Sequence, residues 1–471
     1  MSIQTPDPRR WWALALLCVA QFIVILDTSI IGIALPAIQA SLGFTAEGLS
    51  WIFNAYVIVF GGLLLLGGRL SDLFGARRLF MLGFAILTAG SLVAGLAASQ
   101  DVLLVGRAIQ GLGAALIAPS AMTILMSLFG HNGEDLGKAF AFWGASAAAG
   151  GTAGVFLGGV MTQWISWEWT FLINVPLGIL VLAASPGLLR KGLVSQGQVD
   201  WLGAIVITAA LVLGVHAIVT TEPGRWTSAA TLGQSGAALA LLVLFAILQS
   251  LRKAPLLPLR IFKAPDLAVG NLLMALLGAA WIPLWFYLNL YLQQTLGFSA
   301  WESGLALVPM TVAIMILMVG FSGRLIALLG PKTNLVLGLA IMAAALVWFA
   351  RLPADGDYWI DVLPASLLAA LGMSLAYIPA TMVGVSGARS EETGLASGLI
   401  NTTYQVGSAV GLAAMVAVAA SHGTGADAGG ALTLLDGFRA AFKGSAAVAV
   451  AGAFIAFVGL KGRKSVAAPA E

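Results

Sequence analysis

Charged side chains are scarce in this sequence. Asp, Glu, Lys and Arg make up 9% of its 471 residues, whereas hydrophobic residues make up 60%. An ordinary soluble domain carries about 25% charged residues, which cover its surface. A chain surrounded by lipid tails has no such need, and it spans the bilayer as helices when its backbone bonds are satisfied internally. The composition therefore predicts an all-α polytopic membrane protein.

Cysteine and histidine are nearly absent as well. Cys18 is the single cysteine, and His131, His216 and His422 lie far apart, so neither a disulfide framework nor metal-ligand spacing is present. No glycine-rich loop ends in Gly-Lys-Ser or Gly-Lys-Thr, the pattern of a phosphate-binding loop. We therefore expect no cofactor, no metal and no use of ATP by the chain itself. No catalytic constellation stands out, so an enzyme is not expected.

Apolar runs long enough to cross a bilayer recur along the whole chain. A helix needs about 20 apolar residues to cross the hydrocarbon core, and this rule predicts fourteen spans. They lie near residues 12–35, 49–68, 79–99, 102–126, 137–161, 168–189, 201–220, 231–251, 267–294, 303–325, 333–352, 360–384, 392–420 and 441–460. The first run lacks a small-residue cleavage site, so we interpret it as a retained span.

Basic residues are distributed unevenly between the two sides of this span map. Eighteen of the 23 lysines and arginines fall in the N-terminal segment, the C-terminal tail and the connectors that share their side. The opposite side holds Arg225, Arg351, Arg439 and Lys443, and Arg107 falls inside a span. Cytoplasmic loops carry the excess of Lys and Arg, so both termini are expected in the cytoplasm. The net charge of +3 then needs no nucleic-acid partner.

The two halves of the chain repeat each other. Gly68, Arg69, Leu70 and Gly75 recur 255 residues later as Gly323, Arg324, Leu325 and Gly330. The glycine pattern of the span at 137–161 also recurs in the span at 392–420. Transporters often build a central site from such repeats. We therefore expect a six-helix bundle in 1–195, two inserted linker helices in 196–260 and a second six-helix bundle in 261–471.

Four motifs occur in order along the chain. LDTSIIGIALP lies in the first span, GRLSDLFGARR follows the second, RAIQGLGAA lies in the fourth and WEWTFLINVPLG opens the sixth. Over essentially the whole chain they resemble the fourteen-span drug:proton antiporter family of the major facilitator superfamily. The resemblance implies a major facilitator fold, two six-helix bundles plus two inserted transmembrane helices, and proton-coupled export of drug-like compounds.

Some positions depart from that family's pattern. Gly32 and Ser29 stand where Asn and Thr are usual, and Glu168 replaces the usual Arg of a Trp-Arg-Trp signature. The fifth-span motif usually carries Gly-Pro, whereas Gly154 is here followed by Val155. The neighbouring glycines still permit close helix packing, but a bend caused by Pro is not expected. A different coupling mechanism therefore stays open.

Asp27 is the only acid placed well inside a predicted span, and Arg107 is the only base. A charge at the bilayer centre costs at least about 3 kcal/mol on insertion scales, so such residues usually mark a functional path. We expect Asp27 to be the protonation site and Arg107 to take part in proton coupling, a role that the family resemblance also implies for Arg107. The alternative is an ion pair that only holds two helices together.

Polar and aromatic side chains form stripes on three predicted spans. The stripes consist of Asn54 and Tyr56, of Trp281, Trp285, Asn289 and Gln293, and of Asn401, Tyr404 and Gln405. Polar groups do not face lipid tails, so the stripes are expected to line a substrate chamber. Aromatic faces suit flat apolar ligands and attract organic cations. The alternative is contact between helices, with Trp and Tyr anchoring the chain at the membrane surface.

A further group of residues is expected to control switching between conformations. It consists of Gly68, Arg69, Asp72, Gly75, Arg77 and Arg78 in the loop after the second span, and of Gly150, Gly154 and Gly158 in the fifth. A charge network around Asp72 that latches one conformation would tip a two-state equilibrium when it breaks. The alternative for the arginines is charge that only sets topology.

Export of amphipathic, cationic compounds across the cell membrane, driven by protons and working by alternating access, is the leading functional hypothesis. Its partners would be a small-molecule substrate, protons and membrane lipids, and the default oligomeric state is a monomer. A transporter of a specific endogenous metabolite with different coupling, such as Na⁺, is the second hypothesis. A membrane-embedded enzyme or lipid-handling protein is the third, and it lacks a catalytic motif.

Overall fold

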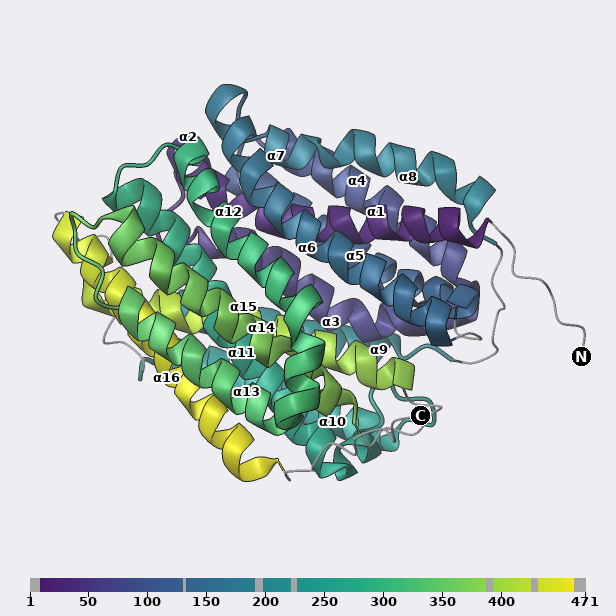
Figure 1. Ribbon diagram of the computed structural model, residues 1–471. Coiled ribbons are helices and arrows are strands. Elements are labelled where there is room, and N and C mark those ends of the chain that lie inside the picture. Colours follow the sequence, from purple (N-terminus) through teal and green to yellow (C-terminus); the bar gives the residue numbers. More distant parts are fainter. Residues whose placement is uncertain are drawn as a thin grey trace, which may run out of the picture.

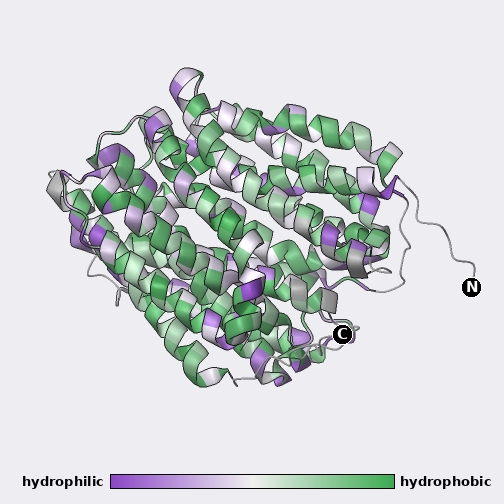
Figure 2. Ribbon diagram, viewed as in Figure 1, coloured by the Kyte–Doolittle hydropathy of each residue, from purple (hydrophilic) through white to green (hydrophobic). Residues whose placement is uncertain are grey.

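The computed structural model describes residues 9–129, 133–190, 198–221, 227–386, 393–424 and 431–460. Regular structure within these ranges is helical throughout, which confirms the predicted all-α class. The helices run side by side along the length of the molecule (Figure 1). Hydrophobic residues cover most of their length, and hydrophilic residues gather mainly near their ends (Figure 2).

The helices vary in length and several are divided by turns. They are α1 Arg10–Ser29, α2 Ile31–Leu42, α3 Ser50–Phe74, α4 Ala76–Gly95, α5 Gln100–Phe129, α6 Gly133–Trp164, α7 Trp169–Leu172, α8 Asn174–Leu188, α9 Trp201–Val219, α10 Ala229–Leu251, α11 Pro265–Leu290, α12 Ala300–Ile316, α13 Ser322–Phe349, α14 Leu363–Val385, α15 Thr393–Ala419 and α16 Ala431–Gly459. A 3₁₀ turn lies at Leu259–Lys263, and π-helical turns lie at Tyr291–Thr295, Leu317–Phe321, Tyr358–Val362 and Ala420–Thr424.

Thirteen helices within the described ranges are long and apolar enough to cross a membrane, so the protein is an integral membrane protein. The predicted span at 303–325 is missing from this number because α12 has only 17 residues. A π-helical turn at Leu317–Phe321 connects α12 directly to α13, and α13 itself is interrupted at Gly330. The number fourteen therefore stays a prediction, since this span is divided between two helices.

The predicted repeat has the same backbone feature in both copies. Gly75 separates α3 from α4 with a φ of 91°, and Gly330 interrupts α13 with a φ of 79°. A side chain is strained at such positive φ values, so glycine is needed at both turns. The two Gly-Arg-Leu sequences thus each precede a sharp turn between helices. The boundaries 1–195, 196–260 and 261–471 stay predictions.

Glycines allow helices α6 and α15 to lie directly on their neighbours. A Cβ atom at Gly150 would lie 2.6 Å from the carbonyl oxygen of Phe22 in α1, and one at Gly158 would lie 2.7 Å from that of Ile30. The repeated helix α15 packs on α11 in the same way, with Gly411 against Ala279. Small residues thus allow the close backbone approach typical of membrane helices.

Two helix pairs form the main contacts between the first and second halves of the chain. Helix α6 packs against α12, and α3 packs against α15. At the first contact the Trp164 and Trp301 rings lie 4.9 Å apart, and Gly304 approaches the carbonyl oxygen of Val155. Val155, which stands where the resembled family usually has Pro, is fully buried there. The C-terminal part of α6 is therefore closed against the second half.

The inserted helices α9 and α10 form an antiparallel pair beside the second contact. Helix α9 packs against both α3 and α15, so it touches both halves. Asp200 caps α9 by accepting from Gly203 N at 2.9 Å, and its other oxygen accepts from Gln249 Nε2 of α10 at 2.7 Å. Gln249 in turn accepts from the backbone N–H of Leu257 at 2.9 Å. This buried cluster fixes the pair to the segment that leads into α11.

Two adjacent glycines in α3 provide a test of this packing. We expect Gly67→Ala to destabilise the fold by about 1–3 kcal/mol, because its Cβ would collide with the carbonyl oxygen of Ala115 in α5. The matched control is Gly68→Ala, whose Cβ would lie 3.7 Å from Pro119, an ordinary contact. Thermal unfolding of the purified proteins in one detergent measures the difference. Equal melting temperatures would show that α3 and α5 are not closely packed.

Candidate functional site

Asp27 lies at the centre of a closed polar cluster inside the first half of the chain. Its Oδ2 accepts from Arg107 Nη1 at 2.8 Å, and its Oδ1 accepts from Gln110 Nε2 at 2.7 Å and from Asn174 Nδ2 at 2.6 Å. The side chains of Asp27 and Arg107 are both 0% exposed. The sequence-based pairing of these two charges is therefore present, and it is sealed from solvent.

Arg107 has further partners around the same point. Its Nε donates to the carbonyl oxygen of Ile52 at 3.0 Å, and its Nη1 also donates to Gln110 Oε1 at 2.8 Å. The guanidinium carbon lies 4.5 Å from the centre of the Tyr56 ring and 5.9 Å from that of Phe171. Two aromatic faces thus replace part of the water that a free guanidinium would have.

Three buried polar atoms in this cluster have no hydrogen-bond partner in the described part of the chain. They are Arg107 Nη2, the Tyr56 hydroxyl and Asn174 Oδ1. An unsatisfied buried polar group costs about 1–3 kcal/mol, so such groups seldom persist without a role. Among the described residues, the cluster therefore keeps an unused donor and unused acceptors close to the carboxylate of Asp27.

The helix that carries Asp27 is divided just beyond it, at Ile30, although the backbone of Ile30 stays helical with a φ of −65° and a ψ of −33°. The Thr28 hydroxyl donates to the carbonyl oxygen of Ile25 at 2.8 Å, and the Ser29 hydroxyl donates to the same oxygen at 3.0 Å. Such bonds compete with the helix ladder and bend helices. Pro36, which lacks an N–H, lies further on inside α2. α1 therefore ends at Ser29, and α2 continues from Ile31 with almost no interruption.

Two members of the cluster were missed by the sequence reasoning. Asn174 begins α8, and Ser91 in α4 accepts from Gln110 Nε2 at 2.8 Å. Asn174 belongs to the WEWTFLINVPLG motif, where it is the lone amide of an apolar run, and this signal was available in the sequence. Ser91 gave no comparable signal, because single serines are common in membrane helices. Only the fold brings α4 and α8 to Asp27.

The aromatic and amide stripe of α11 lies against the first half. Trp281 and Trp285 have ring centres 6.3 Å apart. Asn289 donates to the carbonyl oxygen of Trp285 at 2.8 Å, while its Oδ1 is buried without a partner. Its amide nitrogen would lie 3.0 Å from a Cβ at Gly32, so Asn289 fills the space where the resembled family usually has an Asn side chain.

Gln293 joins the two halves directly. Its Nε2 donates to the carbonyl oxygen of Ile33 in α2 at 2.9 Å. Gln294 adds a second bond, from Nε2 to Gln39 Oε1 at 3.0 Å. Both bonds attach the end of α11 to α2, the helix that continues from Asp27. In this conformation Gln293 bridges the two halves, and its predicted place in the substrate chamber stays a prediction.

The stripe of α15 lies opposite α3 and α11. The Tyr404 ring is 5.8 Å from that of Tyr377 in α14 and nearly perpendicular to it. Gln405 packs against Gly61 of α3, where an added Cβ would lie 2.8 Å from its own Cβ. Asn401, one turn earlier, is exposed. These residues therefore share one helix but differ in their surroundings.

Asn54 and Tyr56 point to different environments. Tyr56 is part of the Asp27 cluster through its contact with Arg107. Asn54 is 1% exposed, and neither its amide nitrogen nor its amide oxygen has a partner in the described residues. Its neighbour Phe53 lies 6.1 Å from Phe286 of α11, which places this turn of α3 at the contact between the halves.

The predicted switching residues lie at two places. Gly68, Arg69 and Asp72 occupy the end of α3, Gly75 forms the turn, and Arg77 and Arg78 begin α4. Arg69 Nε donates to the carbonyl oxygen of Gln198 at 3.3 Å, which ties this loop to the segment before α9. Gly154 of α6 packs against α1, and a Cβ atom added at Gly154 would collide with Ser29. The fifth-span glycines thus contact the helix that carries Asp27.

The site shows no arrangement for a metal. Within the described ranges, no group of three or more His, Cys, Asp or Glu residues could bind a metal ion. The buried carboxylate, its guanidinium partner and the two amides instead form one hydrogen-bonded unit.

Comparisons with known proteins agree on the fold and on a class of relatives. The profile described as Major Facilitator Superfamily matches residues 17–412. The chain is 38% identical over 420 residues to the cephamycin export protein CmcT of Amycolatopsis lactamdurans, covering 88% of this chain and 86% of that protein. It is 33% identical over 471 residues to the lincomycin resistance protein of Streptomyces lincolnensis, covering 98% and 94%.

Solved structures of transporters share the fold at low sequence identity. The nucleoside transporter NupG superposes with a TM-score of 0.68 at 13% identity, covering 96% of this chain and 100% of that chain. A D-xylose-proton symporter superposes with a TM-score of 0.67 at 13% identity, covering 96% and 98%. At this identity the likeness concerns the fold alone.

The buried pair allows a stability test that needs no transport assay. We expect Arg107→Met to destabilise the protein by about 3–5 kcal/mol, because it leaves Asp27 charged and unpaired in an apolar core. Adding Asp27→Leu to it should restore most of the loss, since replacing both partners by apolar groups is often close to neutral. Thermal unfolding of both single variants and the double variant measures the coupling. Additive losses would mean that the pair is not a unit.

Proposed function

The chain belongs to the Major Facilitator Superfamily, and on that basis we propose that it exports amphipathic, drug-like compounds across the cell membrane in exchange for protons. The observation that carries the proposal is the sealed Asp27–Arg107 pair with its unused donor and acceptors. The curated relatives, whose names state export of or resistance to antibiotics, support the direction and the substrate class.

Protonation of Asp27 changes the balance of the cluster. The neutral carboxyl no longer attracts the charge of Arg107. Its O–H can instead donate a hydrogen bond to Asn174 Oδ1 or to the Tyr56 hydroxyl oxygen. Arg107 is then left as an unpaired buried charge, which strongly destabilises this arrangement. The cluster therefore favours a different packing of its helices when the proton is bound. Differential stability of this kind is what a coupling ion must supply.

The helix of Asp27 transmits this change to the contact between the halves. α2 continues from α1 within four residues of Asp27, and its Ile33 carbonyl oxygen accepts from Gln293 in the π-helical turn after α11. α1 also packs against the glycines of α6, and α6 in turn packs against α12 of the second half. A shift of α1 thus alters both contacts on this side. Rigid rocking of two bundles is the motion that repeat-built transporters use.

The substrate is proposed to bind between the halves, beside α3, α11 and α15. Asn54 and Asn289 have buried amide atoms without a partner among the described residues, and Trp281, Trp285 and Tyr404 supply aromatic faces. A pocket that binds small molecules combines mostly apolar walls with a few polar groups that fix orientation. Asn401 and Gln405 belong to the same path on α15.

The remaining parts of the proposal concern switching and topology. The loop of Gly68, Arg69, Asp72, Gly75, Arg77 and Arg78 controls the cytoplasmic side, and the inserted pair α9–α10 follows its movement through Arg69 and Gln198. Both termini lie in the cytoplasm, by the distribution of basic residues. Each half buries its polar faces against the other, so a monomer suffices.

A second function, transport of a specific endogenous metabolite with Na⁺ or other coupling, is supported by Val155. α6 runs through this position as one helix of 32 residues and has no Pro-induced bend there. The transport assay below separates the two functions by the ion gradient that drives uptake.

The coupling role of Asp27 is tested in proteoliposomes. With an imposed pH gradient and a fluorescent lipophilic cation, we expect the wild type to accumulate the cation against its gradient. Asp27→Asn should abolish this accumulation, because the amide keeps the shape of the carboxyl but cannot exchange a proton. Asp101→Asn, an exposed acid at the start of α5, is the matched control and should transport normally. Cation accumulation by Asp27→Asn under the pH gradient would refute this role. Transport by the wild type under a Na⁺ gradient, but not under a pH gradient, would favour the second function.

The substrate path is tested with two asparagines of equal burial. Asn54→Leu should leave the melting temperature unchanged or raise it, because no hydrogen bond is lost, yet it should lower transport at least several-fold. Asn271→Leu is the control, since Asn271 donates to Leu267 and Gly384 at 2.9 Å and accepts from Thr403 at 3.2 Å. It should lower the melting temperature. Full transport by Asn54→Leu would remove Asn54 from the path.

A further inference from the structure

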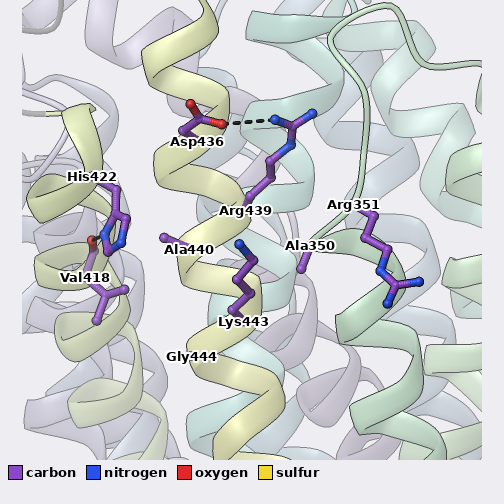
Figure 3. A pocket seen from close by; sticks show the side chains of 9 residues that line it. All are labelled: Ala350, Arg351, Val418, His422, Asp436, Arg439, Ala440, Lys443 and Gly444. Atoms are coloured by element: carbon purple, nitrogen blue, oxygen red, sulfur yellow. Dashed lines mark hydrogen bonds and ion pairs between the residues drawn. The ribbon is translucent and has the colours of Figure 1, made fainter.

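Three of the four basic residues that break the charge asymmetry of the sequence meet in one cavity. Arg351, Arg439 and Lys443 line a cavity of about 840 Å³ together with His422 and Asp436 (Figure 3). The fourth such residue, Arg225, lies outside the described residues. Basic residues on the outer side of a membrane protein oppose the usual distribution. Their convergence from separate segments needs its own explanation.

The cavity lies where three helices of the second half end or begin. Arg351 follows α13, His422 lies in the π-helical turn after α15, and Arg439 and Lys443 lie one turn apart on α16. Arg439 Nε donates to the carbonyl oxygen of Leu352 at 2.9 Å, which fixes the α13 end to α16. Figure 3 shows Lys443 on α16 between His422 on one side and Arg351 on the other.

Among the described residues that line this cavity, positive charge exceeds negative charge. Asp436 is the only acid among them, and its Oδ1 already accepts from Arg439 Nη1 at 3.0 Å. The side chains of Arg351 and Lys443 make no ion pair or hydrogen bond with the described part of the chain. Like charges that share a concave surface raise the local potential and attract an anion. The cavity therefore has two cations free to bind one.

We propose that this cavity binds a net anionic phosphate group, with Arg351 and Lys443 as its direct partners and Arg439 as the residue that positions them. The planar guanidinium and the point charge of an ammonium are both established phosphate-binding groups. A phosphate that carries its own ammonium group is disfavoured by the excess positive charge. The site is separate from the Asp27 cluster, which lies in the first half.

The location favours a membrane phospholipid as the source of this phosphate. α16 exposes Val450, Phe454 and Phe457 along its length beyond the cavity, which suits contact with acyl chains. Arginine and lysine bind phosphate head groups through charge-assisted hydrogen bonds. The alternative is that Lys443 and Arg351 are only solvated surface charges. That would explain each residue by itself, but it would not explain why three basic residues that oppose the charge pattern lie around one cavity.

The test measures anion binding to the purified full chain in a neutral detergent. Native mass spectrometry counts retained phosphatidylglycerol against phosphatidylcholine, and thermal unfolding is followed with each lipid and with inorganic phosphate. We expect phosphatidylglycerol to bind more tightly than phosphatidylcholine, with an affinity that falls as salt rises. Arg351→Gln and Lys443→Gln should each weaken binding about tenfold, the loss of one charge-assisted contact.

Two further variants serve as controls. Lys253→Gln removes the same charge from an exposed position at the opposite end of the bundle and should leave binding unchanged. Asp436→Asn frees Arg439 and should tighten binding, so the proposal is tested even where removal of a cation impairs folding. Stabilisation by phosphatidylglycerol but not by inorganic phosphate identifies the lipid as the source. Equal stabilisation by both identifies a free phosphate site.

Either of those results supports the phosphate site. The proposal is overturned if phosphatidylglycerol and phosphatidylcholine bind alike and inorganic phosphate does not stabilise the protein. It is also overturned if Arg351→Gln with Lys443→Gln binds as the wild type does, or if Asp436→Asn leaves binding unchanged.

Discussion

The ion pair between Asp27 and Arg107 is the constraint on which the first half of the protein depends. Two charges that are 0% exposed remain in an apolar bundle only while each compensates the other. Their bonds to Gln110 and Asn174 and the contact with Tyr56 bring helices α1, α3, α5 and α8 to one point. Any event that changes the charge of Asp27 therefore changes the packing of several helices at once.

This dependence connects the polar cluster with the contact between the halves. α2 continues the helix of Asp27 from Ile31, and its Ile33 is bound to Gln293 in the π-helical turn after α11. Glycines of α6 hold the same helix on the other side. A small movement near Asp27 is thus passed to α11 and, through α6, to α12. The proposed proton site and the proposed substrate path lie in different places, but helices α2 and α6 connect them.

The second half contains a contrasting polar region. At Asp27 both charges are buried and compensated, whereas Arg351 and Lys443 are exposed and have no ion-pair partner among the described residues. Buried compensation suits the proposed proton site, while exposed cations suit the proposed binding of an anion from outside. The two proposed sites thus place charge in opposite environments in the two halves.

The sequence by itself determined the helical membrane fold, because scarce charge and long apolar runs leave few other structures. It also identified Asp27 and Arg107 as charges inside spans, since lone charges in apolar spans are rare, and it showed that Gly75 and Gly330 are equivalent positions of a repeat. Tertiary structure alone decided that Asn174 and Ser91 join Asp27, that Tyr56 stacks on Arg107 and that Gln293 bridges the halves. It also decided that Arg351, Arg439 and Lys443 meet. Sequence periodicity defines the face of one helix, but which helices pack together depends on contacts between residues far apart in the chain.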